Sequence, residues 1–123
     1  MASILIVDDD ADVCELLSYK LRHAGFEVHT ESDGETGLAA ARELRPDVVV
    51  LDWMMPRMTG SEVCGAIRGD ASLAGVPVIM LTAKAQEPDV ERGFAAGADD
   101  FVVKPFSARE LMSRIRVQLS RTA

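Results

Sequence analysis

Acidic residues stand directly after two strongly apolar segments of this chain, at the point where each segment ends. The segment 4–7 is followed by Asp8 and Asp9, and the segment 48–51 is followed by Asp52. Carboxylates that lie close together repel each other and raise each other's pKa unless a cation lies among them. Carboxylate oxygens are also the ligands that Mg2+ prefers in proteins. The pattern predicts a divalent-metal pocket, and one of its carboxylates is a candidate for chemistry.

Two further polar residues follow apolar segments later in the chain, and their types suit the binding of phosphate. Thr82 ends the segment 76–82, and Lys104 follows the segment 101–103. A hydroxyl donates a hydrogen bond to a phosphoryl oxygen, and an ammonium group neutralises its charge. Together with the metal pocket, these groups favour phosphoryl transfer, a reaction in which positioning and charge neutralisation supply most of the rate.

Asp52 is the candidate nucleophile of this set, because the predicted local structure gives it no other role. Residues 53–56 after it do not begin a helix, whereas Asp10 is predicted to cap a helix that begins at Ala11. A carboxylate that attacks phosphorus forms an aspartyl phosphate. We therefore interpret Asp52 as the reacting group, and Asp8 and Asp9 as metal ligands.

Short apolar segments alternate with longer amphipathic segments, and this alternation predicts five strand–helix units. The apolar segments are rich in β-branched residues without polar alternation, which is typical of strands buried on both faces of a parallel sheet. Short connections between parallel strands require right-handed crossovers and helices on both faces of the sheet. The predicted strands are 4–7, 26–30, 47–52, 76–82 and 101–103. The predicted helices are 11–24, 36–44, one that begins at Ser61, 88–96, and one that ends near Ser120 and begins with a capping box of Ser107 and Glu110.

This predicted sheet would bring the polar residues together. Ligands of an open parallel sheet bind outside the carboxyl ends of its strands, near the point where the strand order reverses. The polar residues that follow strands in this way are Asp8, Asp9, Asp52, Thr82 and Lys104.

The composition is that of one globular domain with an acidic surface. The 123 residues are 48% hydrophobic and 27% charged, which is enough for a core without disulfides or metals. The net charge of −7 argues against direct binding of nucleic acid, because phosphate backbones require a basic surface. The chain has neither a long apolar run nor a leader peptide, so we expect no membrane contact and a cytoplasmic location. Cys14 and Cys64 lack metal-ligand spacing and are interpreted as buried small side chains.

Four motifs follow one another along the chain. They are Ile-Leu-Ile-Val-Asp-Asp-Asp at 4–10, Val-Val-Val-Leu-Asp-Trp-Met-Met-Pro at 48–56 with Gly60 after it, Val-Ile-Met-Leu-Thr-Ala at 78–83, and Gly-Ala-Asp-Asp-Phe-Val-Val-Lys-Pro-Phe at 97–106. In order and spacing, the set resembles the receiver domain of bacterial two-component response regulators, over about residues 3–120. The resemblance implies an α/β, flavodoxin-like (βα)5 fold with strand order 2-1-3-4-5. It further implies that residues 1–123 are a single receiver domain, with no effector domain in this chain.

The resemblance implies a role for each residue of the pocket. Asp52 corresponds to the phosphoryl acceptor. Asp8 and Asp9, together with Asp52 and the backbone carbonyl of Met54, correspond to the ligands of Mg2+, for which Mn2+ can substitute. Lys104 corresponds to the lysine that binds the phosphoryl group.

The resemblance also implies a two-state switch that a sensor histidine kinase or a phosphotransfer protein controls. Thr82 would move toward the phosphoryl group, and Phe101 would rotate inward to fill the vacated space. Phe101 lacks the hydroxyl of the tyrosine that is common at this position, so a core phenylalanine on the edge strand is the alternative interpretation. The changed conformation would act on an output domain or a partner protein. Such a domain is not a conventional enzyme, although it would catalyse its own phosphorylation and dephosphorylation.

The charged residues around the last strand and helix have two interpretations. A helix with acid at its start and base at its end can be a solvated face, as the helix dipole favours. The resemblance instead implies the dimer face of winged-helix regulators, which would form a homodimer after phosphorylation. Val90 stands where that face usually carries a basic partner for the glutamate. The candidate residues are Asp99, Asp100, Glu110, Arg114 and Arg121.

Two other classes of protein share part of this pattern. Haloacid-dehalogenase-type phosphatases form an aspartyl phosphate after their first strand, and Asp8-Asp9-Asp10 superficially offers their Asp-x-Asp motif. Against this class, Asp12 stands where threonine or valine is expected, the chain has no length for a cap, and Asp52 is left unexplained. A receiver-like adaptor that never accepts phosphate normally lacks an acidic residue or the lysine, and this chain retains all of them.

Overall fold

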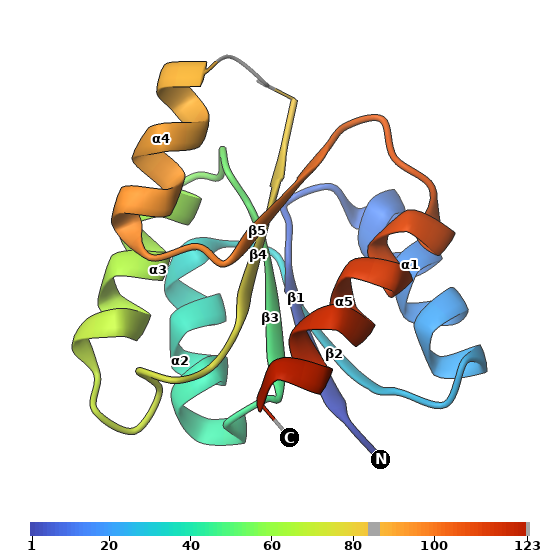
Figure 1. The fold of residues 1–123 in the computed structure, drawn as a ribbon. Coiled ribbons are helices and arrows are strands. Elements are labelled where there is room, and N and C mark those ends of the chain that lie inside the picture. Colours follow the sequence, from blue (N-terminus) through green and yellow to red (C-terminus); the bar gives the residue numbers. More distant parts are fainter. Residues whose placement is uncertain (84–86, 123) are drawn as a thin grey trace.

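The centre of the molecule is a five-stranded parallel sheet with the strand order β2-β1-β3-β4-β5 (Figure 1). The computed structural model describes residues 1–83 and 87–122, without the side chains of residues 87–90, 93 and 122. The strands are β1 (Ser3–Val7), β2 (Glu27–Glu31), β3 (Val48–Asp52), β4 (Val78–Thr82) and β5 (Asp100–Val103). The helices are α1 (Ala11–His23), α2 (Gly34–Leu44), α3 (Gly60–Gly69), α4 (Glu87–Ala96) and α5 (Ala108–Thr122). The predicted fold class and strand order are therefore confirmed.

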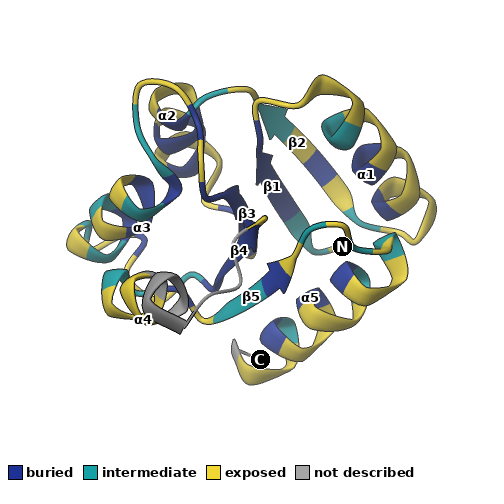
Figure 2. Ribbon diagram, turned by 90° about the horizontal axis from the view of Figure 1, so that it is seen from above, coloured by how far each residue is buried: buried dark blue, intermediate teal, exposed yellow. Residues whose placement is uncertain are grey.

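The helices form one layer on each face of this sheet. Helices α1 and α5 cover one face, and helices α2, α3 and α4 cover the other (Figure 1). The sheet itself is the most deeply buried part of the molecule, while the outer faces of the helices are exposed (Figure 2). This explains why the central strands carry consecutive rather than alternating apolar residues, up to the polar residues at their ends.

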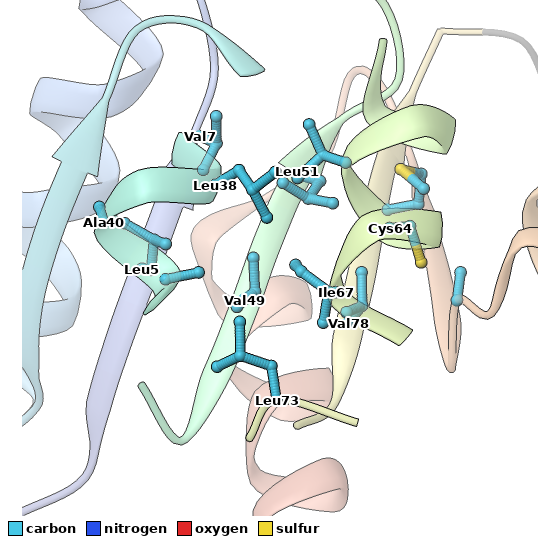
Figure 3. Close-up of a cluster of buried hydrophobic side chains, with 14 of the residues drawn as sticks. Leu5, Val7, Leu38, Ala40, Val49, Leu51, Cys64, Ile67, Leu73 and Val78 are labelled. Carbon is cyan, nitrogen blue, oxygen red and sulfur yellow. The ribbon is translucent and has the colours of Figure 1, made fainter. Parts of the chain in front are cut away.

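Successive residues of each central strand point into different cores, because side chains alternate across a strand. In β1, Ile4 and Ile6 pack toward α1 and α5, whereas Leu5 and Val7 pack toward α2 and α3. Figure 3 shows the second of these cores, in which residues of α2 and α3 lie against β1, β3 and β4. Two apolar cores pack against the sheet from both faces, and this holds in place the residues that follow its strands.

Helix caps decide where the helices begin, and one cap accounts for a difference between a predicted and an observed helix start. Asp10 caps α1 as predicted, because its carboxylate accepts hydrogen bonds from the backbone N–H groups of Asp12 and Val13. The complete capping box lies at Thr59 and Glu62, so α3 begins at Gly60 rather than at the predicted Ser61. At α5 the Ser107 hydroxyl accepts from the Glu110 N–H at 3.1 Å, which is one of the two bonds of the predicted box. A Thr-x-x-Glu pattern was thus present in the sequence and missed. 

Gly60 allows α3 to begin directly against the strand that ends at Asp52. A Cβ atom at this position would lie 2.3 Å from the Asp52 carbonyl oxygen and 3.0 Å from the Trp53 Cα. The Gly60 N–H donates to the Trp53 carbonyl at 2.9 Å, so the two segments are also bonded to each other. Because both neighbouring atoms belong to the backbone, they cannot move aside without distorting the end of β3.

Replacing Gly60 with alanine is therefore expected to lower the free energy of unfolding by at least about 2 kcal/mol. Gly65 is a matched control in the same helix, since a Cβ there would meet no atom within 4 Å. Gly65→Ala is expected to raise stability by up to about 1 kcal/mol, because alanine loses less backbone entropy in a helix. Urea denaturation followed by circular dichroism measures both changes. Equal effects of the two substitutions would contradict the close approach at Gly60.

Candidate functional site

The carboxyl ends of three strands bring three predicted site residues into contact. Asp8 follows β1, Asp52 ends β3, and Lys104 follows β5. The strand order reverses between β1 and β3, and this is where ligands of doubly wound sheets bind. The site therefore lies at the edge of the sheet that the sequence predicted, at the top of the sheet in Figure 1.

Lys104 forms an ion pair with two aspartates. Its Nζ donates to Asp8 Oδ2 at 3.1 Å and to Asp52 Oδ1 at 3.2 Å. The backbone N–H of Lys104 donates to the Thr82 carbonyl at 2.7 Å, which fixes the lysine against the end of β4. The Lys104–Pro105 peptide bond is cis. Residues from three strands are thus linked through one ammonium group.

The two aspartates that contact Lys104 are almost fully removed from solvent. Asp8 is fully buried and Asp52 is 7% exposed. Asp8 Oδ1 also accepts a hydrogen bond from the Asp10 N–H at 2.9 Å. Buried carboxylates are costly unless they are paired and hydrogen-bonded, and both conditions are met here.

Burial raises the pKa of Asp52 to about 6, and the negative charge of Asp8 adds to this increase. Lys104 opposes the increase through its charge and its hydrogen bond. Burial also acts to lower the pKa of Lys104, but its bonds to Asp8 and Asp52 outweigh burial, so that pKa lies above its usual value. The cluster therefore carries a net negative charge at neutral pH, because one ammonium group lies between two carboxylates.

The donor set of this cluster fits a hard divalent cation. Asp8, Asp9 and Asp52 each offer one carboxylate oxygen, and these three oxygens lie within 4.8 Å of one another. Mg2+ is held by one or two carboxylates together with waters and phosphate oxygens. Asp9 is exposed, which leaves one side of the group open to solvent. A cation here would also reduce the repulsion that raises the pKa of Asp52.

A nearby thiol does not take part in this donor set. Cys14 Sγ donates to the Asp8 carbonyl oxygen at 3.3 Å. Burial raises the pKa of the Cys14 thiol to about 11, and the charge of Asp8 adds to the increase. The thiol is therefore protonated at neutral pH, whereas metal binding requires a thiolate.

The remaining predicted site residues lie on the neighbouring strands or directly after them. Thr82 ends β4 beside β3 and is buried, with 1% of its surface exposed. Met54 lies two residues after Asp52, with an exposed side chain. Phe101 lies on the edge strand β5, is half-buried, and packs against the core under α3 and α4. This packing suits both of the predicted roles of Phe101.

The candidate dimer-face residues lie along one groove beside α5. This groove has a volume of about 640 Å³. Within the chain, Arg114 pairs with Asp100 at 3.1 Å, and Asp99 Oδ2 accepts from Arg68 at 2.6 Å. Asp99 Oδ2 also accepts from the Val78 N–H at 2.8 Å. The lining includes all five predicted residues, Asp99, Asp100, Glu110, Arg114 and Arg121, whereas the side chain of Val90 lies outside the described residues.

Comparison with known proteins identifies the family of this chain. Residues 4–116 match the model of the response regulator receiver domain. The chain belongs to this family. A DNA-binding response regulator, MtrA of Mycobacterium tuberculosis, is 49% identical over 118 residues, which cover 96% of this chain and 50% of that protein. The DNA-binding dual master transcriptional regulator RpaA of Synechocystis is 44% identical over 99% of this chain and 51% of that protein. This receiver domain thus spans about half the length of the curated relatives it matches.

Solved receiver structures have the same fold. The chemotaxis protein CheY4 of Vibrio cholerae superposes with a TM-score of 0.91 at 37% identity, covering 95% of this receiver domain and 98% of that chain. The Francisella response regulator 1452 receiver domain superposes with a TM-score of 0.93 at 30% identity and covers both chains completely. Within residues 1–83 and 87–122, every helix is too short or too polar to span a lipid bilayer.

The sequence of this receiver domain did not reveal two groups of contacts near the site. One is the pairing of Lys104 with both aspartates, since the sequence assigned this lysine to phosphate alone. The other is a set of aromatic contacts that joins Trp53, Phe101 and Phe94. No local pattern indicates either group, because each contact joins residues of different strands, helices or loops.

The raised pKa of Asp52 predicts how stability depends on pH in a metal-free solution. The folded receiver domain binds this proton more tightly than the unfolded chain, so stability falls as pH rises from about 4 to about 6. Asp52→Asn removes the buried charge while Asp8 still pairs with Lys104. The substitution is therefore expected to raise the free energy of unfolding at pH 7 by on the order of 1 to 2 kcal/mol, with little gain at pH 4.

Urea denaturation at both pH values, with a chelator present, measures this effect. Glu15→Gln removes an exposed acid on α1 and serves as the control, with little expected change. A loss of stability in Asp52→Asn at pH 7 would contradict an unfavourable burial of this charge.

Proposed function

We propose that this receiver domain is a phosphorylation-dependent signalling switch with Asp52 as its phosphoryl acceptor. The phosphoryl group would come from the phosphohistidine of a sensor histidine kinase, from a phosphotransfer protein, or from a small phosphodonor. The observation that carries the proposal is the contact of one ammonium group, Lys104, with two buried carboxylates at the carboxyl edge of the sheet. The family match over residues 4–116 supports the same function.

The chemistry is a direct displacement at phosphorus. An Asp52 carboxylate oxygen attacks the phosphorus atom, the new O–P bond forms, and the P–N bond to the donor histidine breaks. The displaced imidazole takes up a proton from solvent. Lys104 is held beside the attacking carboxylate, where its positive charge stabilises the negative charge that spreads over the phosphoryl oxygens.

We propose Asp8, Asp9, Asp52 and the Met54 carbonyl as the ligands of Mg2+, with Mn2+ as a substitute. When bound, the metal would supply charge neutralisation at the phosphoryl oxygens and reduce the repulsion among the carboxylates. The buried Asp8 is held by the Asp10 N–H, so this oxygen set is oriented before any cation arrives.

Thr82 and Phe101 are the proposed switch residues. Thr82 ends the strand next to Asp52, and its hydroxyl would donate to a phosphoryl oxygen. Movement of Thr82 opens space that the Phe101 ring on the neighbouring strand β5 would fill. The phosphoryl group thereby favours one of two packings of the same side chains.

The output would lie outside this receiver domain. We propose that residues 1–123 form one receiver unit and act on a further domain or on a separate partner protein. The relatives MtrA and RpaA carry DNA-binding in their names and are about twice as long. The net charge of −7 favours an indirect connection to nucleic acid for this chain. Because phosphohistidine forms from ATP, we place the exchange in the cytoplasm.

Incubation with acetyl phosphate and Mg2+ tests the acceptor. The intact mass is expected to increase by one phosphoryl group in the wild type and to stay unchanged in Asp52→Asn, because only a carboxylate forms the acyl phosphate. Omission of the metal should remove most of the product. Asp12→Asn, an exposed acid on α1, is the control and should be modified like the wild type.

The same measurement separates the alternatives. Modification that survives in Asp52→Asn but disappears in Asp8→Asn would favour a haloacid-dehalogenase-type site and overturn the assignment. A wild type that is never modified, although it binds Mg2+, would favour a receiver-like adaptor.

We also propose that phosphorylation drives homodimer formation through the groove beside α5. Charged residues of both signs gather there, among them Asp100, Glu110, Arg114 and Arg121. Arg114 and Asp100 are already paired within the chain but remain partly exposed, at 48% and 19% of their side chains. They can therefore exchange partners between two copies at little cost in desolvation. Asp99 is instead tied to Arg68 and the start of β4, so its role in the dimer is indirect.

Analytical ultracentrifugation with Mg2+ and beryllofluoride, a phosphoryl mimic, tests this dimer. The wild type is expected to shift from monomer to dimer when the mimic is added. Glu110→Arg should remain monomeric, because it reverses a charge in the groove. Glu15→Arg makes the same change on α1 and should dimerise like the wild type. An unchanged monomer in the wild type would remove the idea.

A further inference from the structure

Three aromatic rings form a continuous chain of contacts from the residue after Asp52 to the surface of α4. The ring centroids of Trp53 and Phe101 are 6.0 Å apart, with their planes tilted by 40°. The centroids of Phe101 and Phe94 are 5.0 Å apart, with their planes at 64° in an edge-to-face arrangement. Both pairs lie within the range of favourable aromatic contacts. The middle ring is the proposed switch residue.

Trp53, the innermost of the three rings, is held in place. Trp53 is 9% exposed, and its backbone N–H donates to the Leu81 carbonyl at 2.8 Å. The Trp53 Cα lies so close to Gly60 that a Cβ atom added to this glycine would be 3.0 Å from it. The backbone of Trp53 is therefore held in place, and because the residue is buried, its indole has little room to follow a movement of its neighbour.

Phe101, the middle one of the three rings, can move only by rotation of its side chain. The backbone of Phe101 belongs to β5 and pairs with Met80 in the parallel ladder. One residue further along, Val102 pairs with Leu81, and Leu81 in turn pairs with Asp52. The Phe101 ring thus lies one residue below the level of the acceptor, and a rotation about its side-chain bonds is the movement that the sheet permits.

Phe94, the outermost of the three rings, has space to change its orientation. Phe94 is 49% exposed, although it is a large apolar residue. Its ring is the only described aromatic neighbour of Phe101 besides Trp53. A rotation of Phe101 toward the site would therefore break the edge-to-face contact with Phe94 while the indole stays in place.

We propose that Phe94 is a positioning residue of the switch, whose ring holds Phe101 in the unphosphorylated arrangement. The inference rests on the proposed function and adds a residue on α4 to it. A contact that exists in only one of two states stabilises that state, so this contact opposes binding of the phosphoryl group. By linkage, occupation of the site must also change the surroundings of Phe94 at the α4 surface.

A purely structural role for Phe94 makes a different prediction. If the ring only covers the Phe101 edge, it stabilises the free and the bound protein equally. Its removal would then lower the melting temperature but leave ligand affinity unchanged, because a ligand responds only to differences between the two states.

Titration with Mg2+ and beryllofluoride distinguishes these roles, with the fluorescence of Trp53, the single tryptophan of the chain, as the signal. Phe94→Ala is expected to bind the mimic about fivefold more tightly than the wild type. Phe94→Leu should lie between the two, since it keeps apolar bulk without a ring edge. Leu44→Ala is the matched control, because Leu44 is 46% exposed at the far end of α2 and has no ring contact.

Fluorine NMR of protein labelled with fluorophenylalanine provides a second readout. The chain has four phenylalanines, and single Phe→Leu variants assign their resonances. The mimic is expected to shift the signals of Phe94 and Phe101 together and to leave that of Phe26 in place. Unchanged or weaker affinity in Phe94→Ala, or a Phe94 signal that stays fixed while that of Phe101 shifts, would overturn the inference. If the wild type fails to bind the mimic, the proposed function itself fails and this inference fails with it.

Discussion

The ion pair of Lys104 with Asp8 and Asp52 is the interaction on which the site depends. Two carboxylates are held almost out of solvent at the end of an apolar sheet, and one ammonium group offsets their repulsion. The compensation is incomplete, because burial and the charge of Asp8 keep the pKa of Asp52 near 6. Excess negative charge in a preformed pocket is what a divalent cation can relieve. Binding of a cation would therefore stabilise the pocket, because it removes repulsion between carboxylates that the free protein leaves uncompensated.

The rest of the fold serves to keep these groups in place. Two apolar cores pack against the sheet from both faces, so the residues that follow its strands have little freedom. Gly60 brings the start of α3 onto the backbone of β3 just at Asp52, and Thr82 binds the backbone of Lys104 through its carbonyl. A shift at the site therefore cannot be absorbed by the strands. It must be taken up by side chains that have space beside them.

The edge strand β5 is where that space exists. It contains Phe101, which lies between the fixed Trp53 and the exposed Phe94. It also contains Asp100, whose partner Arg114 lines the groove beside α5. A rearrangement of β5 side chains would thus affect both α4 and α5. The backbone just before β5 is held in place, because Asp99 accepts from Arg68 and from the Val78 N–H, and Arg68 also donates to the Val76 carbonyl.

The sequence by itself determined the fold class, the strand order through its family resemblance, and the residues of the acidic pocket. It could do so because apolar runs buried on both faces and strand-end aspartates are local patterns with one common tertiary solution. It placed the third helix one residue late, because the Thr59–Glu62 capping box was overlooked. Only the tertiary structure decided that Lys104 pairs with two aspartates, that Asp99 is tied to Arg68, and that three rings connect Trp53 to α4. Each of these contacts joins residues from different strands or helices, and their geometry depends on side-chain packing that no local pattern encodes.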